Sequence, residues 1–352
     1  MNEVFSKLPK ELFDLYSCRE EYGGKRDKYG RFLPNPEKRS YFAKPAVSEY
    51  LLSTGLLKPN WPESKRFAAC LTHDVDIIYP SLKYSFFTSA KLAARLKLHK
   101  SYRRFVGRQI KDYEVNPFWS FRDILALEER YSAKSSFFFK TALDDPVGWT
   151  YRIEDLSEEL GYISDSGFEV AFHGGFYSFD DADVLSTEKK ALEKVLGRSV
   201  TGIRMHFLRF EIPDTWKIIK SLGFKYDSTL GFSTIPGFRN GMCHPFFPYD
   251  LRFGSEINII EIPLIIMDTS LFRMPINEAW SSIKNLILAA ENCKGVITIL
   301  WHTNNYDEAY SPVWSKMYAK ILDFLNQKGA WMTSGQEICN YWSKNADGFW
   351  KH

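Results

Sequence analysis

The feature that most constrains the fold is an alternation of short apolar runs and amphipathic segments that begins at Ser135. The apolar runs have the length of buried strands, and the amphipathic segments have helical spacing. Predicted strands cover 135–139, 168–172, 200–204, 224–227, 258–262 and 295–301, with a last one near Trp331. Predicted helices cover 154–166, 183–196, 213–223, 276–292 and 312–327. Such alternation predicts a parallel sheet with helices outside it.

A further apolar run, Phe67–Leu71, precedes this alternation and ends in T-H-D-V-D. We interpret it as the opening strand, in which Asp74 and Asp76 lie on one side while Val75 points away. Two carboxylates this close resist ionising together unless a cation or a shared proton joins them. The strand end therefore predicts a metal site or a proton-sharing pair, with an Asp-rich surface turn as the alternative.

Polar residues also follow the other predicted strands, at the positions His173, Arg204, Asp227 and His302. The carboxyl ends of the strands form the active-site face of a closed (β/α) barrel, and open doubly wound sheets bind ligands there as well. No G-x-G-x-x-G pattern opens a helix, so a dinucleotide-binding fold is disfavoured. We expect these side chains and the two aspartates to meet on one face of the sheet.

Each of these residues has a candidate role and a structural alternative. His173 is a candidate metal ligand. Arg204 near Asp74 would hold that carboxylate ionised, as a general base must be, although any structural ion pair would also explain the arginine. His302 follows the clearest strand and is a candidate general acid, with a packed core histidine as the alternative. Asp227 near His302 would orient its ring, unless it caps a turn.

The remaining chain divides into two parts outside the alternation. Residues 1–65 mix short apolar clusters with turn signals and predict a helical and irregular amino-terminal layer, which leaves residues 66–352 for the catalytic unit. Residues 80–120 interrupt that unit as a helical insertion in which every charged residue from Lys91 to Lys111 is basic. A basic amphipathic helix can bind a membrane surface or a phosphate-bearing ligand, whereas a solvated helical face is the simpler interpretation.

Composition excludes several classes of protein. The net charge of +3 is too small to indicate nucleic-acid binding, and five scattered cysteines form no C-x-x-C pair, which argues against a disulfide framework and a cysteine zinc site. Aromatic residues are abundant at 16%, and some could line a sugar-binding groove. The amino terminus lacks an apolar signal core and no stretch could span a bilayer, so we expect a cytoplasmic protein.

Taken together and in order, these motifs resemble those of the polysaccharide deacetylase superfamily, carbohydrate esterase family four, over roughly residues 66–335. The resemblance implies a distorted (β/α) barrel of 7–8 parallel strands. In the first motif, D-V-D, it implies that Asp74 is the base and Asp76 a metal ligand. The fourth motif matches Asp227, and the fifth, Leu-x-His, matches His302.

The second and third motifs depart from the family pattern. Where the family has His-x-x-x-His, this chain has H-G-G-F-Y, so His173 matches the first ligand and Tyr177 stands at the second. The third motif is R-M-H-F, in which Arg204 matches and His206 stands where proline is usual. A catalytic zinc takes three protein ligands and an open water position. We therefore hypothesise that His206 supplies the missing imidazole.

The resemblance implies metal-assisted amide hydrolysis, with Zn²⁺ as the expected divalent metal. In that reaction Asp74 takes a proton from water, a backbone N–H near Phe207 helps to hold the oxyanion, and His302 protonates the departing amine. Further residues expected to contact the substrate are Tyr177, Phe207, Trp301 and His244. The expected substrate is an amino sugar of a surface polysaccharide or of its lipid- or nucleotide-linked precursor. The alternatives are an amidohydrolase acting on a non-sugar amide, cyclic imide or N-formyl group, and a non-catalytic carbohydrate-binding relative.

Overall fold

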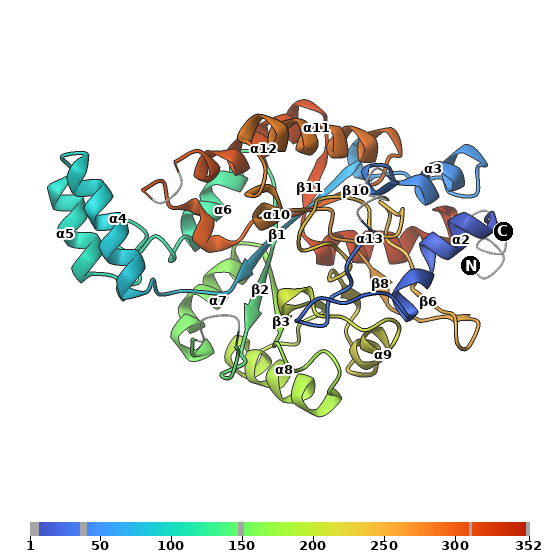
Figure 1. Cartoon of the computed structure of the whole chain (residues 1–352), viewed down its shortest axis with the longest axis horizontal. Helices are drawn as coiled ribbons and strands as arrows, with labels where there is room; N and C mark the ends of the chain where they lie inside the picture. Colours follow the sequence, from blue (N-terminus) through green and yellow to red (C-terminus); the bar gives the residue numbers. More distant parts are fainter. Residues whose placement is uncertain (1–6, 36–40, 147–150, 310–311, 350–352) are drawn as a thin grey trace.

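The computed structural model describes residues 7–35, 41–146, 151–309 and 312–349. Its central feature is a curled parallel sheet that forms a half-barrel with helices around it, and this confirms the predicted fold class (Figure 1). The strands pair in the order β8-β5-β4-β3-β2-β1-β10-β9, with β11 also on β1. Their bounds are β1 (Ala68–Val75), β2 (Ser136–Lys140), β3 (Glu169–Gly174), β4 (Gly202–Met205), β5 (Tyr226–Asp227), β8 (Ile260–Glu261), β9 (Ile266–Met267), β10 (Val296–Leu300) and β11 (Trp331–Thr333). A separate antiparallel pair consists of β6 (Tyr249–Asp250) and β7 (Ser255–Glu256).

Strand β1 lies at the centre of the sheet and has three neighbours. Its residues 68–72 pair with β10 on one edge. On the other edge residues 68–70 pair with β11 and residues 72–75 pair with β2. All eight residues of β1 are buried, because helices cover its outer side and the half-barrel interior covers its inner side.

The helices pack around the sheet, as the alternation predicts (Figure 1). Helix α8 begins after Asp181, whose side chain accepts hydrogen bonds from two backbone N–H groups, and it ends at Gly197, which adopts the left-handed φ of 77°. The helices are α2 (Lys10–Tyr16), α3 (Ala46–Ser53), α4 (Leu82–Ala94), α5 (Leu98–Val106), α6 (Phe121–Glu129), α7 (Ser157–Asp165), α8 (Ala182–Leu196), α9 (Asp214–Ser221), α10 (Asp268–Leu271), α11 (Ile276–Asn292), α12 (Met317–Gln327) and α13 (Gly335–Phe349).

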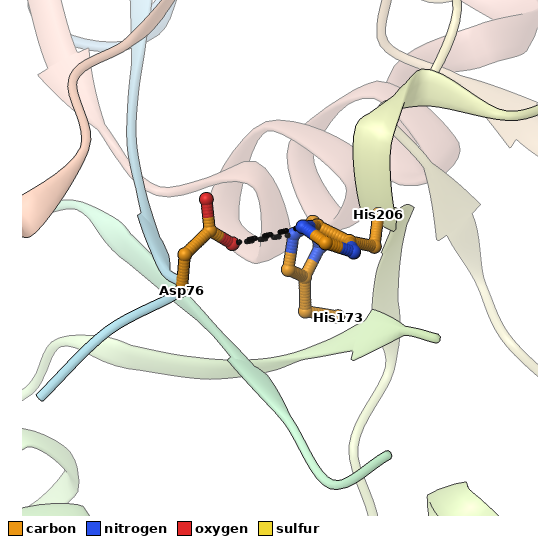
Figure 2. A group of neighbouring side chains, drawn as sticks. All are labelled: Asp76, His173 and His206. Atoms are coloured by element: carbon orange, nitrogen blue, oxygen red, sulfur yellow. Dashed lines mark ion pairs between the residues drawn. The ribbon is translucent and has the colours of Figure 1, made fainter. Parts of the chain in front are cut away.

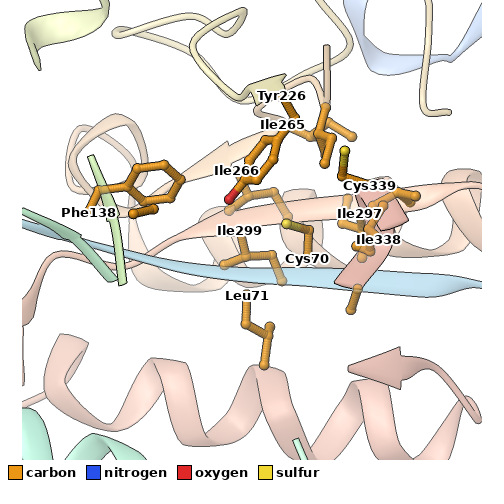
Figure 3. Packing of buried hydrophobic residues seen from close by; sticks show 14 of the residues in the cluster. Cys70, Leu71, Phe138, Tyr226, Ile265, Ile266, Ile297, Ile299, Ile338 and Cys339 are labelled. Atoms are coloured by element: carbon orange, nitrogen blue, oxygen red, sulfur yellow. The ribbon is translucent and has the colours of Figure 1, made fainter. Parts of the chain in front are cut away.

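The core combines aliphatic side chains from the strands with large aromatic rings. Figure 3 shows Cys70 of β1, Ile297 and Ile299 of β10, and Tyr226 of β5 packed together, each side chain fully buried or nearly so. The structure contains several elements that the apolar pattern did not predict, among them the two-residue strand β9 and the carboxyl-terminal helix α13. Strand β9 was missed because its two residues lie within a longer apolar run that begins at Leu264.

The two segments outside the alternation adopt different structures. The amino-terminal segment contains α2 and α3, and it is tied to the half-barrel by a buried ion pair between Glu21 and Arg239. Its residues 1–6 and 36–40 lie outside the described residues. The basic segment forms α4 and α5, which lie side by side at the edge of the molecule (Figure 1). No helix of the described residues is long and apolar enough to cross a bilayer.

Candidate active site

The two aspartates of D-V-D meet the interior of the half-barrel at the carboxyl end of β1. Asp74 belongs to the strand and Asp76 follows it, and the two-residue repeat directs both away from the helix layer. His73, which directly precedes Asp74, points to the opposite side of the strand and contacts Glu128 of α6. The alternation of β1 thus separates two sets of polar residues.

Asp76 is the centre of a cluster with two histidines from neighbouring strand ends (Figure 2). Its Oδ1 lies 3.3 Å from Nε2 of His173, at the end of β3, and 3.6 Å from Nε2 of His206, which directly follows β4. Both Asp76 Oδ1 and His173 Nε2 are buried and have no hydrogen-bond partner among the described residues. Buried polar atoms without partners are costly, so their convergence indicates a place for a ligand.

The outer nitrogens of both rings are held by acceptors. Nδ1 of His173 lies 2.8 Å from the backbone oxygen of Arg204, which can only accept, so this nitrogen carries the proton. Nδ1 of His206 lies 2.7 Å from a carboxylate oxygen of Asp145. In His173 the hydrogen bond at Nδ1 leaves the lone pair of Nε2 facing Asp76, and in His206 the ion-pair contact of Nδ1 with Asp145 leaves Nε2 on the side of Asp76.

The charges in this cluster suit a cation. Burial alone would raise the pKa of Asp76, but His206, His173 and His302 outweigh it and hold the pKa well below its usual value. Burial lowers the pKa of His206, which favours the neutral imidazole that a metal requires. Burial opposes the ionisation of Asp145, yet its contact with His206 keeps the pKa of this carboxyl low.

The donor set fits a small divalent metal. Ligands about 2.0–2.2 Å from a tetrahedral zinc lie about 3.3–3.6 Å from one another, which matches the two distances measured from Asp76 Oδ1. Two imidazoles and one carboxylate also form a known donor set of catalytic zinc. Residues Asp76, His173 and His206 would hold the ion.

Asp74 lies beside this cluster and is fixed by Arg204. Its Oδ1 accepts a hydrogen bond of 2.8 Å from Nη1 of Arg204, and its Oδ2 lies 3.6 Å from Nε2 of His173. Arg204 is fully buried, and it donates further hydrogen bonds to Thr72 and Ser228. The structure therefore brings Asp74 and Arg204 into contact, with one oxygen of Asp74 directed toward the three candidate ligands.

His302 lies on the other side of Asp76 and is oriented by Asp268. Its Nε2 is 3.6 Å from Asp76 Oδ2, and its Nδ1 is 2.7 Å from Oδ1 of Asp268. Asp268 also accepts hydrogen bonds from the backbone N–H of His302 and from the side chain of Asn305. Burial would lower the pKa of His302, but the carboxylates of Asp268, Asp76 and Asp74 raise it to about 10. This ring is therefore a proton donor at neutral pH.

The expectation that Asp227 orients His302 is wrong. Asp227 is fully buried at the end of β5, where its Oδ1 accepts hydrogen bonds from the backbone and hydroxyl of Thr229. Burial raises its pKa, and the neighbouring Glu261 has its pKa raised well above the usual value by burial and by Asp227. Asp227 is thus paired with Glu261 of the neighbouring β8, and four strands (β4, β3, β2 and β1) lie between β5 and β10 in the sheet.

The four residues expected to contact substrate lie in four different environments. Tyr177 is 52% exposed, and Phe207 is half-buried with its ring 4.4 Å from the guanidinium of Arg31. The ring of Phe207 contacts His206 and Phe176, whereas Tyr177 contacts only Phe176 in this group. Trp301 is fully buried and packs on Tyr318, so it has no surface to offer a sugar.

His244 lies away from the cluster, in contrast to the expectation that it contacts substrate. Its Nδ1 is 2.9 Å from the hydroxyl of Ser48, and its ring packs on Trp342. The backbone of the adjacent Cys243 accepts a hydrogen bond from Val296, the first residue of β10. His244 is therefore at the amino end of the strands, whereas His302 is at the carboxyl end.

Two residues of the site were not predicted, and each followed a visible signal. Asp145 comes after β2 in L-D-D-P, and Asp268 comes after β9 in I-I-M-D. Both share the pattern of an apolar run that ends in an aspartate, the pattern that had pointed to Asp74 and Asp76. They were passed over because the first lies five residues beyond its strand and the second follows an unpredicted strand.

Comparison with known proteins shows that the fold is that of polysaccharide deacetylases. A crystal structure assigned as a polysaccharide deacetylase from Mycobacterium smegmatis superposes with a TM-score of 0.54 at 18% identity, covering 82% of this chain and 96% of that one. A second, from Pseudomonas aeruginosa PAO1, gives 0.52 at 12% identity, with 92% and 98% covered. The PuuE allantoinase also gives 0.52, at 13% identity, with 84% and 96% covered.

Sequence comparison adds no further assignment. No protein-family model matches the chain, and no curated protein matches it. Since the structural matches are below 20% identity, they establish the architecture, and the chemistry must be argued from the residues of this chain.

Proposed function

We propose that this protein is a metal-dependent hydrolase that removes an N-acyl group, acetyl in the leading case, from an amino sugar of a surface polysaccharide or its precursor. The observation that carries the proposal is the convergence of Asp76, His173 and His206: Asp76 Oδ1 lies 3.3 Å and 3.6 Å from Nε2 of the two histidines, and Asp74 and His302 lie beside this group. A purely structural cluster would satisfy those atoms internally.

The residues around the three candidate ligands divide the proton transfers of amide hydrolysis between them. A divalent metal, zinc in our proposal, would supply a Lewis acid and lower the pKa of a water molecule. Asp74, held by Arg204, accepts the proton of the attacking water. His302, charged and held by Asp268, delivers a proton to the departing amine. The acid and the base thus lie on opposite sides of Asp76.

The substrate class follows from the access to the cluster and from an exposed aromatic ring. Asp76 and His302 retain side-chain exposures of 20% and 12%, so the cluster is reachable from the surface. Tyr177 provides an exposed ring beside Phe176, against which a sugar could stack. The same fold occurs in polysaccharide deacetylases and in an allantoinase, so a non-sugar amide is the competing substrate class.

Two experiments test the proposal. The first is elemental analysis of the purified protein and of His206→Ala. The matched control is His99→Ala, because His99 is exposed on α5, away from the three candidate ligands. We expect His206→Ala to lose bound zinc and His99→Ala to keep it. Undiminished zinc in His206→Ala would remove His206 from the ligand set.

The second experiment is a substrate panel with separate readouts for acetate, formate and ammonia. Release of acetate from N-acetylated sugars supports the deacetylase, whereas formate or ammonia from other amides supports the competing amidohydrolase. No turnover together with no bound metal, even after addition of zinc or cobalt, would support a non-catalytic carbohydrate-binding protein.

A further inference from the structure

The hairpin of α4 and α5 exposes apolar side chains in an arrangement that is inverted relative to an ordinary surface helix. The side chains that α4 buries are mostly small and polar, namely Ser85, Thr88, Ser89 and Leu92. The opposite face of α4 exposes Leu82, Phe86 and Phe87 at 59%, 67% and 49%. A helix in water normally buries the apolar stripe and exposes the polar one.

Helix α5 repeats the inversion. No side chain of α5 is buried, and four apolar residues at helical spacing face solvent: Leu98, Tyr102, Phe105 and Val106, exposed by 40–68%. Leu96, in the turn between the helices, is 88% exposed. Eight large apolar side chains exposed on two packed helices and their turn, on a folded protein, indicate an interaction site.

The exposure does not come from a loosely attached hairpin. Ser101 of α5 donates a 2.8 Å hydrogen bond to the backbone of Ser89 in α4. Arg104 and Tyr84 both contact Asp307, at 2.5 and 2.8 Å, in the segment after His302. Polar residues of both helices thus fix the helices to each other and to the half-barrel, while the large apolar side chains remain exposed.

The charge around this surface is strongly positive. Residues 77–111 contain nine lysines and arginines and no acidic residue. The whole chain carries a formal charge of only +3, so the remainder carries −6. Within the described residues, no acidic side chain pairs with Arg95, Lys97 or Lys100, which are exposed beside the apolar stripes.

From this geometry we propose that the α4–α5 hairpin docks on an anionic phospholipid bilayer, with its apolar stripes in the headgroup region and its lysines and arginines on the lipid phosphates. Apolar stripes flanked by cations are the pattern of helices that lie in the plane of a membrane interface. A second copy of this chain fits the surface poorly, because two such hairpins would bring their positive charges together. An anionic bilayer accepts both the apolar and the basic residues.

The position of the hairpin places such a surface close to the candidate site. Only five residues, 77–81, separate Asp76 from the start of α4. A cavity of about 600 Å³ lies in this region, lined by Ile77 and Tyr79, by Leu82 and Lys83 of α4, and by Arg108, which follows α5. The docked surface and Asp76 would therefore share one side of the molecule.

The test is flotation of the full-length protein with vesicles of phosphatidylcholine alone or mixed with phosphatidylglycerol. It contains no amino sugar, so its outcome is independent of the proposed hydrolase activity. We expect binding to the anionic vesicles that weakens as salt increases, and little binding to the neutral ones. Absence of binding to anionic vesicles, or equal binding to both, overturns the proposal.

Two pairs of variants localise the surface. The double variant Phe86→Ser with Tyr102→Ser removes exposed apolar area. The double variant Lys97→Glu with Lys100→Glu reverses two charges, and each basic residue near an anionic bilayer contributes about fivefold to the binding affinity. We expect each pair to weaken binding at least tenfold. The matched controls are Phe253→Ser, 75% exposed at the β6–β7 turn, and Lys190→Glu with Lys194→Glu on the exposed side of α8. Controls that weaken binding equally would place the docking surface elsewhere.

Circular dichroism and light scattering complete the test. An unchanged spectrum shows that the variants are folded. If the unmodified protein is a dimer in solution and Phe86→Ser with Tyr102→Ser makes it a monomer, the hairpin is a self-association surface and the membrane proposal is wrong.

Discussion

The two faces of strand β1 carry similar chemical groups in very different environments. On the outer face His73 contacts Glu128, and both side chains are fully buried. Glu128 also accepts hydrogen bonds from Ser135 and Tyr318, and the second nitrogen of His73 lies 2.7 Å from the backbone oxygen of Trp301. Every polar atom of this outer cluster has a partner, so it can bind nothing more.

The inner face presents the same residue types, but some of their polar atoms have no hydrogen-bond partner in the described part of the chain. Asp76 Oδ1 and His173 Nε2 face each other without a hydrogen bond, and Asp76 is partly exposed. The two faces therefore differ in whether their polar atoms have hydrogen-bond partners and can be reached from solvent, and not in their residue types. A histidine beside a carboxylate indicates a functional site only where donor atoms remain free and can be reached.

The largest expected effect separates the faces by activity. Asp74→Asn should lower kcat about 10²–10⁴-fold, because the amide cannot accept the proton of the attacking water. Steady-state kinetics on the substrate identified by the panel measures this. Glu128→Gln should retain kcat per folded molecule, and an Asp74→Asn enzyme of full activity would contradict the assignment of the base.

The second prediction separates the faces by stability. Glu128→Gln should lower the free energy of unfolding by about 3 kcal/mol, since it removes the charged acceptor from a buried network of His73, Ser135 and Tyr318. Urea denaturation followed by tryptophan fluorescence gives the value. The neighbouring Glu129→Gln is the control, because Glu129 is 53% exposed and its contact with Lys134 contributes little. Equal effects of the two variants would show that the outer cluster is not a stabilising network.

The third prediction tests whether the inner cluster is organised around a metal. Asp145→Asn should weaken zinc affinity about 10–100-fold, because Asp145 orients His206 and favours a free Nε2. Competition with a zinc chelator measures the affinity without any turnover. Asp144→Asn, at the adjacent exposed position, should leave affinity unchanged. If both variants bind zinc as tightly as the unmodified protein, Asp145 does not orient His206 for zinc binding.

The smallest expected effect concerns a buried histidine far from both faces. Burial lowers the pKa of His244 from 6.5 to about 4. Because the unfolded chain binds the proton at higher pH than the folded one, stability should be full above pH 6.5 and fall toward pH 4. The loss attributable to His244 between pH 7.5 and 5.5 is about 1 kcal/mol.

That loss can be isolated by comparing His244→Gln with the unmodified protein. The variant should show a shallower decline of unfolding free energy over this pH range, whatever its absolute stability. Identical slopes would show that His244 has the same proton affinity in the folded and unfolded chains.

Periodicity predicted the fold well because the strands and helices of the repeating part obey simple spacing rules. The runs at β1, β3 and β10 are long and apolar, and their carboxyl ends could be located within a residue or two. Strand β9 is only two residues long, and its contribution to the sheet depends on pairing with β10, which no local pattern reveals. Asp268 was missed for that reason.

The candidate site was predicted to a smaller extent than the fold. Strand-end polarity identified Asp74, Asp76, His173, Arg204 and His302, which the structure brings together. It also selected Asp227, because a buried carboxylate paired with another carboxylate has the same local sequence as a catalytic one. Trp301 and His244 failed as substrate contacts because burial depends on tertiary packing, which sequence alone does not supply.

The three candidate ligands lie at the ends of three different strands, so a short sequence pattern cannot find similar chains. A search pattern that requires two histidines four positions apart passes over this chain, since residue 177 is Tyr and the second imidazole is at 206. A three-dimensional template, with two imidazole nitrogens 3.3 and 3.6 Å from one carboxylate oxygen, retrieves it. Other genomes can be surveyed with that template for chains in which an imidazole has moved from one loop to the next.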